Sequence, residues 1–323
     1  MKKLIFSVAL LSAALSASAE EHPLWMRYPA ISPDGTTIAF AYKGDLYSVS
    51  VNGGEARQLT THAAFDSHPV WSPDSKKIAF QSNREGSLDI FVIDAKGGAP
   101  TRLTTNSGSE TPIAFADNDH VLYSASLQPT AQSIIFGDNT FPQVYKVSTK
   151  GGRPELFSTL TMEDISIAKN GDILYHDKKG YEDPWRKHQK SPIARDIWLK
   201  SNGKFAKQTT FAGEDRSPVW TSDEKSFFYL SEQDGTFNIY RRSLNSSSDK
   251  QITHHKGNPV RFLTASSADL LCYGYDGEIY TVKEGGEPQK VNISITTDND
   301  APSLVRQIKS WGATEISVSP DAK

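Results

Sequence analysis

The chain has 323 residues, of which 37% are hydrophobic and 23% are charged, and its formal net charge is −3 at pH 7. A chain this close to neutral lacks the basic excess expected for binding nucleic acid or an anionic membrane. Because Cys272 is the single cysteine, a disulfide framework within the chain is also excluded.

Residues 1–19, MKKLIFSVALLSAALSASA, have the three parts of a secretory signal peptide. Two lysines precede an apolar run that is too short for a stable membrane span, and an A-x-A cleavage site follows at 17–19. The alternative is a buried N-terminal helix. We expect an exported protein, periplasmic or otherwise extracytoplasmic, that keeps 33 basic and 38 acidic residues after cleavage. No later stretch approaches the ~18 apolar residues of a membrane span, so no membrane association is expected after cleavage.

From near Tyr28 onward the sequence repeats itself. Each of six units contains an apolar triplet, then an aliphatic–aromatic pair, a Gly-rich or polar turn and a short polar-flanked run. The triplets are Ile38-Ala39-Phe40, Ile78-Ala79-Phe80, Val121-Leu122-Tyr123, Ile173-Leu174-Tyr175, Phe227-Phe228-Tyr229 and Leu271-Cys272-Tyr273. The pairs are Leu46-Tyr47, Ile90-Phe91, Val144-Tyr145, Ile197-Trp198, Ile239-Tyr240 and Ile279-Tyr280. Such a period is typical of a repeat architecture.

Each unit predicts four short antiparallel strands, A to D. Ser-Pro-Asp-Gly at 32–35 suits a type I turn between strands A and B, and Asn-Gly-Gly at 52–54 suits a hairpin between strands C and D. The strand B triplets are apolar at consecutive positions, so both faces of each sheet should be covered. Sheets stacked face to face around a ring provide that cover, and an open β-solenoid is the less suitable alternative because its repeats are usually shorter.

The predicted fold is therefore all-β, a six-bladed β-propeller over 20–296 followed by a linker and the truncated first strand of a second propeller over 297–323. No spare strand is left at either end of the six units. We expect the ring to close by packing blade 1 against blade 6 without exchanging a strand, although 294–310 could still add one there.

Two long insertions interrupt the repeat at the same place. Between the triplet and the pair, the six units have 5, 9, 20, 21, 9 and 5 residues. Equivalent loops of adjacent blades emerge side by side at one end of the ring, and insertions grouped on one face commonly mark a contact site. The blade 4 insertion, 176–196, gathers aromatic and basic candidates for holding a peptide carboxylate or an acidic partner surface: Tyr181, Trp185, Arg186, Lys187, His188 and Arg195. The alternative is that Trp185 caps the loop and the charges are solvated.

The sequence shows no known catalytic signature. It lacks G-x-S-x-G, H-E-x-x-H, a P-loop and G-x-G-x-x-G, so we assign no catalytic residue and no cofactor. His254 and His255 are adjacent on extended backbone and should point apart, which disfavours a metal site. Cys272, within LLCYGY, is expected to be a small buried hydrophobe.

The phrase PxxSPDG…IAF…DLY…NGG…LT resembles the propeller repeat shared by TolB, the prolyl-oligopeptidase relatives and tricorn protease. The repeats begin directly after the leader, six are complete, and 181–198 is similar to blade 4 of bacterial tricorn-like proteins. These features favour the tricorn family, and the resemblance to it covers essentially all of the mature chain. ATEISVSPD at 313–321 then looks like the first strand of a second propeller, and we expect the chain to be truncated there.

The resemblance implies a non-catalytic propeller that gates or steers peptides or unfolded protein segments toward a C-terminal serine peptidase absent from this chain. Its expected partners are those peptides, the downstream domains of the parent and further copies of the parent in a homo-oligomer. The alternative is a TolB-like periplasmic protein-binding module with no enzymatic role. An oligopeptidase propeller would need more blades and an α/β-hydrolase domain.

Overall fold

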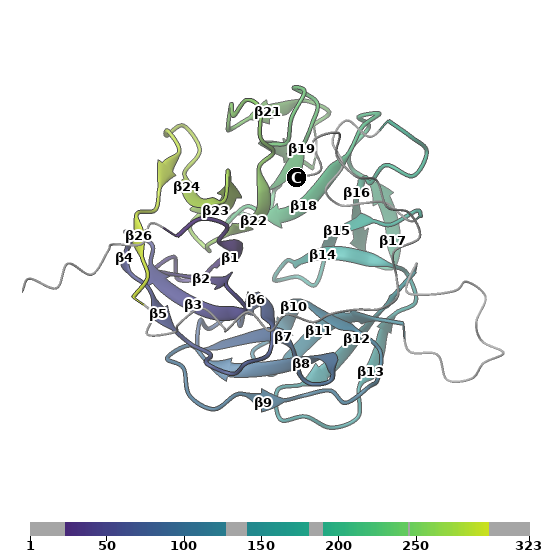
Figure 1. Cartoon of the computed structure of the whole chain (residues 1–323). Helices are drawn as coiled ribbons and strands as arrows, with labels where there is room; N and C mark the ends of the chain where they lie inside the picture. The colour runs from purple at the N-terminus through teal and green to yellow at the C-terminus, as the bar shows by residue number, and fades with distance from the viewer. Residues whose placement is uncertain (1–22, 127–140, 181–189, 245, 297–323) are drawn as a thin grey trace, which may run out of the picture.

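The computed structural model describes residues 23–126, 141–180, 190–244 and 246–296 (Figure 1). Across these ranges the chain forms 26 β-strands and no α-helix. The strands make a closed ring of blades around a centre, which confirms the predicted all-β propeller (Figure 1). The predicted leader, 1–19, and the predicted linker and second propeller, 297–323, lie outside the described residues.

Six four-stranded antiparallel sheets occur in the described residues, each built in chain order from one sequence repeat. Blades 1 to 3 are β1 (Arg27–Ile31), β2 (Thr37–Tyr42), β3 (Asp45–Ser50) and β5 (Arg57–Gln58); β6 (Asp66–Trp71), β7 (Lys77–Glu85), β8 (Ser87–Asp94) and β9 (Thr101–Arg102); and β10 (Glu110–Asp117), β11 (His120–Ala125), β12 (Gln143–Ser148) and β13 (Glu155–Ser158). Blades 4 to 6 are β14 (Met162–Ile167), β15 (Ile173–Asp177), β16 (Ile197–Ser201) and β17 (Lys204–Lys207); β18 (Asp215–Trp220), β19 (Ser226–Ser231), β20 (Asn238–Ser243) and β21 (Asp249–Gln251); and β22 (Arg261–Ala265), β23 (Leu271–Tyr275), β24 (Glu278–Val282) and β25 (Gln289–Lys290).

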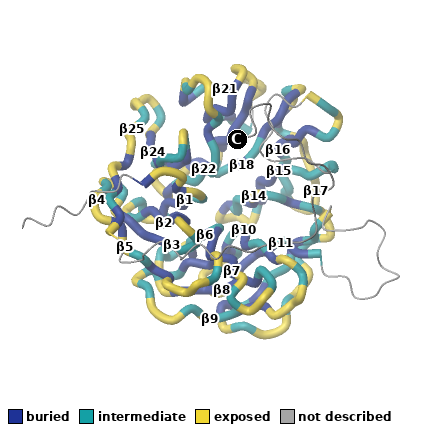
Figure 2. The backbone as a smooth tube through the Cα atoms, viewed as in Figure 1, coloured by how far each residue is buried: buried dark blue, intermediate teal, exposed yellow. Residues whose placement is uncertain are grey.

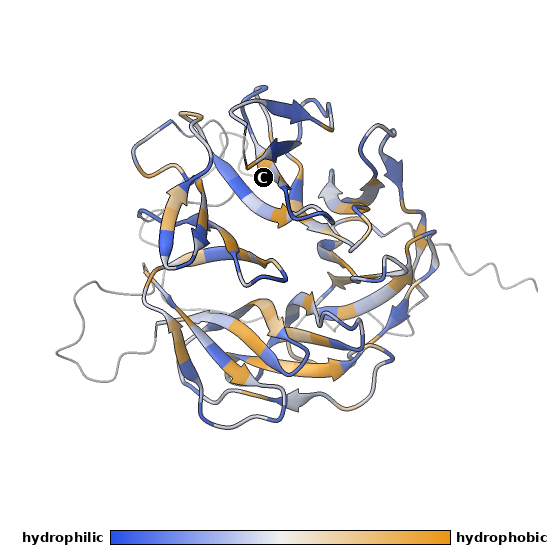
Figure 3. Cartoon of the chain, turned by 180° about the vertical axis from the view of Figure 1, so that it is seen from behind, coloured by the Kyte–Doolittle hydropathy of each residue, from blue (hydrophilic) through white to orange (hydrophobic). Residues whose placement is uncertain are grey.

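The core lies between neighbouring blades, as the consecutive apolar triplets predict. In blade 1, Ile38 and Phe40 pack in one cluster with Cys272 of blade 6, whereas Ala39 packs in another with Phe80 of blade 2. Strand B residues therefore alternate between the two neighbours, and the middle strands of the blades are buried (Figure 2). Seen from the opposite side, hydrophobic residues follow the same strands (Figure 3). Each large buried side chain contributes about 1.5–3 kcal/mol.

Cys272 is 0% exposed and belongs to the cluster between blades 6 and 1, so the prediction of a buried hydrophobe is confirmed. Burial, the largest cause, raises the pKa of its thiol well above the usual range. The thiolate is therefore disfavoured in the folded chain, and the side chain is chemically inert there.

The ring closes where blade 6 meets blade 1, and every strand of these two sheets comes from its own repeat, as predicted. The structure adds one feature. The short β26 (Ile293–Ser294) pairs in parallel with β4 (Gly54–Glu55) on the outer side of blade 1. The Gly54 amide donates to the Asn292 carbonyl and the Ala56 amide to the Ser294 carbonyl, both at 2.8 Å. The seam is thus held by backbone hydrogen bonds as well as by packing.

Candidate functional site

The innermost strand of each blade carries an irregularity. These strands, β1, β6, β10, β14, β18 and β22, lie nearest the centre of the ring (Figure 1). In each described blade the register between this strand and the next one shifts partway along. At five of the shifts a non-glycine residue has positive φ: Tyr28 (54°), His68 (54°), Asp164 (48°), Ser217 (50°) and Phe262 (59°). A β-bulge of this kind re-aims a side chain.

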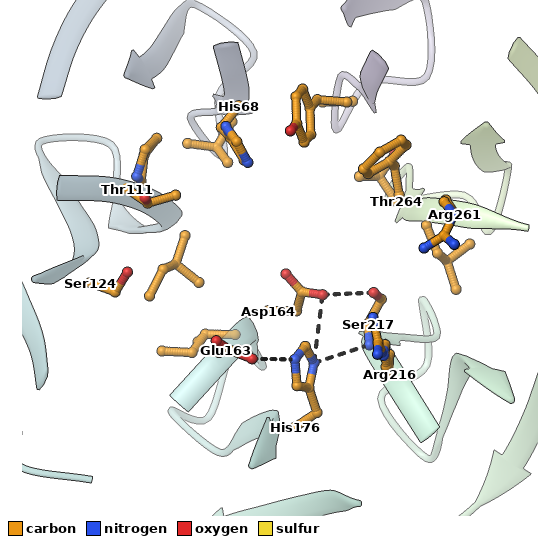
Figure 4. Close-up of a pocket in the computed structure, with 18 of the residues that line it drawn as sticks. His68, Thr111, Ser124, Glu163, Asp164, His176, Arg216, Ser217, Arg261 and Thr264 are labelled. Carbon is orange, nitrogen blue, oxygen red and sulfur yellow. Dashed lines mark hydrogen bonds and ion pairs between the residues drawn. The ribbon is translucent and has the colours of Figure 1, made fainter. Parts of the chain in front are cut away.

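These residues, together with Thr111 at the equivalent position of blade 3, line one central cavity of about 610 Å³ (Figure 4). We call the set of Tyr28, His68, Thr111, Asp164, Ser217 and Phe262 the bore ring. A bulky L-residue at positive φ costs on the order of 1–3 kcal/mol. The surrounding blades maintain that strain at one repeated position, which is a feature commonly found at functional sites.

Residues near the ends of the two long insertions line the cavity. Ser126 and Pro142 belong to the blade 3 insertion, and Lys178 and Arg195 belong to the blade 4 insertion. The bases of the insertions of adjacent blades therefore meet at the same end of the ring.

One half of the bore ring is aromatic. Tyr28 lies between His68, with ring centroids 3.7 Å apart, and Phe262, with centroids 4.7 Å apart. Burial lowers the pKa of His68 to about 4, and the opposing effect of the Asp164 charge does not outweigh it. His68 is therefore neutral at pH 7. The three rings form an aromatic arc across blades 6, 1 and 2.

The opposite half is polar. The Ser217 hydroxyl donates to Asp164 Oδ2 at 2.6 Å, and the Ser217 amide donates to His176 Nδ1 at 3.3 Å (Figure 4). Because Nδ1 accepts, the ring proton lies on Nε2, which donates to Glu163 Oε2 at 3.1 Å. The Ser217 hydroxyl thus orients Asp164, which points into the cavity (Figure 4).

Behind this half lies a buried charge network. Arg195, 5% exposed, donates through Nε to Glu163 at 3.0 Å and through Nη1 to Glu214 at 2.7 Å, and Arg216 also pairs with Glu214 at 2.6 Å. Burial opposes ionisation of Glu163, but its hydrogen bond with His176 and the nearby positive charges hold its pKa well below the usual range. Burial also opposes the charge of Arg195, yet Glu163 and Glu214 together raise its pKa. Both groups are therefore ionised.

A buried carboxyl group lies at the start of the next inner strand. Asp215 is 0% exposed, and burial raises its pKa to about 7, outweighing the nearby hydroxyls of Ser231 and Thr209. Glu110 starts the inner strand of blade 3 and has a pKa raised to about 7 for the same main reason. Neither residue lines the cavity, so both affect stability rather than binding.

Of the predicted binding residues, Arg195 lies in the cavity wall, with its charge engaged by Glu163 and Glu214. Tyr181, Trp185, Arg186, Lys187 and His188 lie outside the described residues. The bore ring was not predicted. A signal for it exists, because in four of the repeats the ring residue directly precedes a proline: Tyr28-Pro29, His68-Pro69, Thr111-Pro112 and Ser217-Pro218.

Ser217, His176 and Asp164 lie close together, but their hydrogen bonds do not match a catalytic triad. In a triad the serine hydroxyl donates to the imidazole, which in turn donates to the carboxylate. Here the hydroxyl donates directly to Asp164, and the imidazole Nδ1 accepts a backbone amide. Ser217 therefore positions Asp164.

The described ranges contain no group of three or more His, Cys, Asp or Glu side chains arranged to hold a metal ion. His255 stacks on Tyr275 with centroids 3.9 Å apart, and its Nε2 lies 2.9 Å from the Tyr273 hydroxyl. Both contacts join the loop between blades 5 and 6 to strand β23 of blade 6. In the same ranges no helix has the length and apolar character that a membrane span requires.

Comparison with known proteins agrees with this geometry. A family model described as "Tricorn protease N-terminal beta propeller domain" matches residues 23–288. Tricorn protease homolog 1 of Streptomyces coelicolor is 24% identical over 278 residues, covering 84% of this chain and 25% of the relative. Tricorn protease of Thermoplasma volcanium is 26% identical over 283 residues, covering 83% and 26%. The chain thus spans about a quarter of the length of the curated relatives it matches.

Among solved structures, the crystal structure of the tricorn protease superposes with a TM-score of 0.71 at 20% identity, over 87% of this chain and 27% of that chain. TolB from Acinetobacter baumannii gives a TM-score of 0.58 at 14% identity, over 84% and 65%. At these identities the structures show the fold alone, and the family follows from the match over 23–288. The chain belongs to the tricorn protease N-terminal β-propeller family.

Proposed function

We propose that this chain is the non-catalytic propeller of an exported tricorn-like serine protease. It takes peptide or an unfolded protein segment into its bore and steers it toward a peptidase domain of a longer parent protein. The observation that carries the proposal is the bore ring, six inward side chains around one cavity in a propeller of the tricorn family.

The shape and chemistry of the cavity support peptide as the ligand. Its volume of about 610 Å³ falls within the range of small-ligand sites, roughly 300–1,000 Å³. An aromatic arc faces hydrogen-bonding and charged groups across it, and peptides present both apolar side chains and polar backbone. The strained backbone at the bore ring supports a functional rather than a packing role for these residues.

The proposed location and assembly rest on the sequence and on the relatives. Residues 1–19 support export to the periplasm or another extracytoplasmic space. The likeness to tricorn proteases about four times as long as the matched region supports the proposed downstream peptidase and homo-oligomeric parent. Expression of the whole gene in its host, followed by fractionation and N-terminal sequencing, tests export; an uncleaved cytoplasmic product would contradict it.

Cysteine protection tests peptide entry directly. Ser124→Cys places a thiol in the cavity wall, and Thr101→Cys places one on the exposed outer strand β9 as a matched control. The native Cys272 is buried, so a maleimide dye labels only the introduced thiol. A mixture of unstructured peptides should slow labelling of Ser124→Cys and leave Thr101→Cys unchanged. Equal labelling of both variants with and without peptide would favour the TolB-like alternative, a propeller that docks folded partners.

A further inference from the structure

We propose that the carboxylate of Asp164, facing the aromatic arc of Tyr28, His68 and Phe262, binds a positively charged group of the incoming peptide. The ligand class is an ammonium or a guanidinium. This inference rests on the proposed function, because it names the kind of peptide that the bore selects.

Asp164 differs from the other carboxylates of the cavity region. Glu163 pairs with Arg195 and Lys178, and Glu214 pairs with Arg195 and Arg216. Within the described residues, no Lys or Arg forms an ion pair with Asp164; its charge acts on the nearby Arg216 guanidinium, but Arg216 pairs with Glu214 at 2.6 Å. The Ser217 hydroxyl donates to Asp164 at 2.6 Å, and His176 Nδ1 lies 3.5 Å away. The side chain of Asp164 is 54% exposed to the cavity. The protein therefore neutralises Glu163 and Glu214 with its own arginines and lysine, and it leaves Asp164 available to a ligand.

The orientation of Asp164 is fixed before a ligand arrives. Its positive φ of 48° turns the side chain inward, and the Ser217 hydroxyl holds oxygen Oδ2. Oxygen Oδ1 takes no hydrogen bond from any residue that the structure describes. A preoriented acceptor loses little conformational entropy on binding, which favours affinity.

The opposite side of the cavity suits a cation as well. Tyr28 and Phe262 line this side of the cavity, and a cation within about 6 Å of an aromatic ring is attracted to the ring quadrupole. His68 extends the arc and is neutral at pH 7, so it does not repel a cation. Arg216 and Arg261 also line the cavity, and the charge of Arg216 is engaged by Glu214. The proposed cation site is therefore the space between the Asp164 carboxylate and the aromatic arc.

Two parts of a peptide could supply this charge, the N-terminal α-ammonium or a Lys or Arg side chain. Four peptides of one neutral sequence with an amidated C-terminus separate them: fully blocked, free at the N-terminus, blocked with a central Lys, and blocked with a central Glu. Isothermal titration calorimetry of each on the intact chain gives the dissociation constants. We expect at least one of the two cationic peptides to bind about tenfold or more tightly than the blocked neutral peptide, as for a charge-assisted hydrogen bond.

The decisive variant is Asp164→Asn, which keeps the shape and tolerates positive φ, because Asn is enriched in that region. It should bring the cationic peptides to the affinity of the neutral peptide and leave the neutral peptide unchanged. Glu155→Gln, which removes an equal charge from the outer strand β13, should bind like the parent. Circular dichroism checks that each variant is folded.

The outcomes separate the two proposals. If all four peptides bind equally, if the Glu peptide binds most tightly, or if Asp164→Asn leaves the preference intact, the cation site is wrong while peptide uptake stands. If no peptide binds, the proposed function fails and the cation site fails with it.

Discussion

Replacing Gly53 by alanine tests how the ring is closed. Gly53 has a φ of 82° in the C–D turn of blade 1, and Gly151 has a φ of 77° in the equivalent turn of blade 3. Both amides donate to the backbone carbonyl oxygen of the serine three residues earlier, at 2.8 Å. A Cβ on Gly53 would lie 2.4 Å from the Asn292 carbonyl oxygen, whereas a Cβ on Gly151 would meet nothing within 4 Å. Gly151→Ala is therefore a matched control.

Both variants lose stability because an L-residue is placed at positive φ, and only Gly53→Ala also loses hydrogen bonds at the seam. An L-residue in left-handed geometry costs about 1–2 kcal/mol at either position. At Gly53 the added Cβ would also overlap the Asn292 carbonyl, so β26 must move away from β4. Two hydrogen bonds, from Gly54 to Asn292 and from Ala56 to Ser294, are then lost, each contributing about 1 kcal/mol. Gly53→Ala should therefore lose about 2 kcal/mol more than Gly151→Ala.

Urea unfolding measures the free energies of unfolding of both variants against the parent. Amide hydrogen exchange at Gly54 and Ala56 reports the seam itself and should become faster only in Gly53→Ala. Equal losses of stability in the two variants would refute the reasoning, because β26 would then contribute nothing to closure.

Three further predictions concern buried groups. Burial raises the pKa of Asp215 to about 7, so the stability linked to its protonated form is complete below about pH 3.8 and is lost as the pH rises through 7. Relative to the parent, the free energy of unfolding of Asp215→Asn, measured in urea, should therefore be higher at pH 8 than at pH 5 by about 2–3 kcal/mol. Arg195→Leu removes a positive charge that pairs with the 2% exposed Glu214, and it should lower the free energy of unfolding by about 3–5 kcal/mol. Lys146→Leu breaks an exposed ion pair and should lower it by less than about 1 kcal/mol. Similar losses in the two variants would contradict the burial argument. Cys272 should react with a maleimide only after unfolding, and rapid labelling of the native chain would show that the interface between blades 6 and 1 opens.

The architecture could be predicted because the interior of a propeller repeats in sequence. The triplets, such as Ile38-Ala39-Phe40, are apolar at consecutive positions because each blade is covered on both faces, and the clusters that join Phe40 to Cys272 and Ala39 to Phe80 show that cover. The sequence did not decide whether the segment after blade 6 pairs with blade 1, as β26 does with β4. This pairing uses backbone groups and requires little of the side chains at Ile293 and Ser294.

The bore ring could not be predicted from the repeat alone. Its position is constant, but its residue type changes from blade to blade, from Tyr28 to Asp164 to Phe262. A sequence repeat reflects what the blades share, and the bore is where they differ. A register shift also turns the side chain away from the face that simple alternation assigns to it, so only the backbone geometry places it in the cavity.

The blade 4 insertion, in contrast, was predicted as a binding site because its aromatic and basic residue types are recognisable in the sequence. Only Arg195 among those candidates lies in the described residues, and the structure places it in the cavity wall with its charge engaged by two glutamates. The roles of Tyr181, Trp185, Arg186, Lys187 and His188 in binding stay predictions.

A crystal structure of the chain with a lysine-containing peptide tests the central claim most directly. The account predicts peptide density inside the bore ring, with a cationic group within hydrogen-bonding distance of Asp164 and beside the ring of Tyr28 or Phe262. Peptide bound only along the outer strands, or on the blade surfaces with the bore unoccupied, would contradict it.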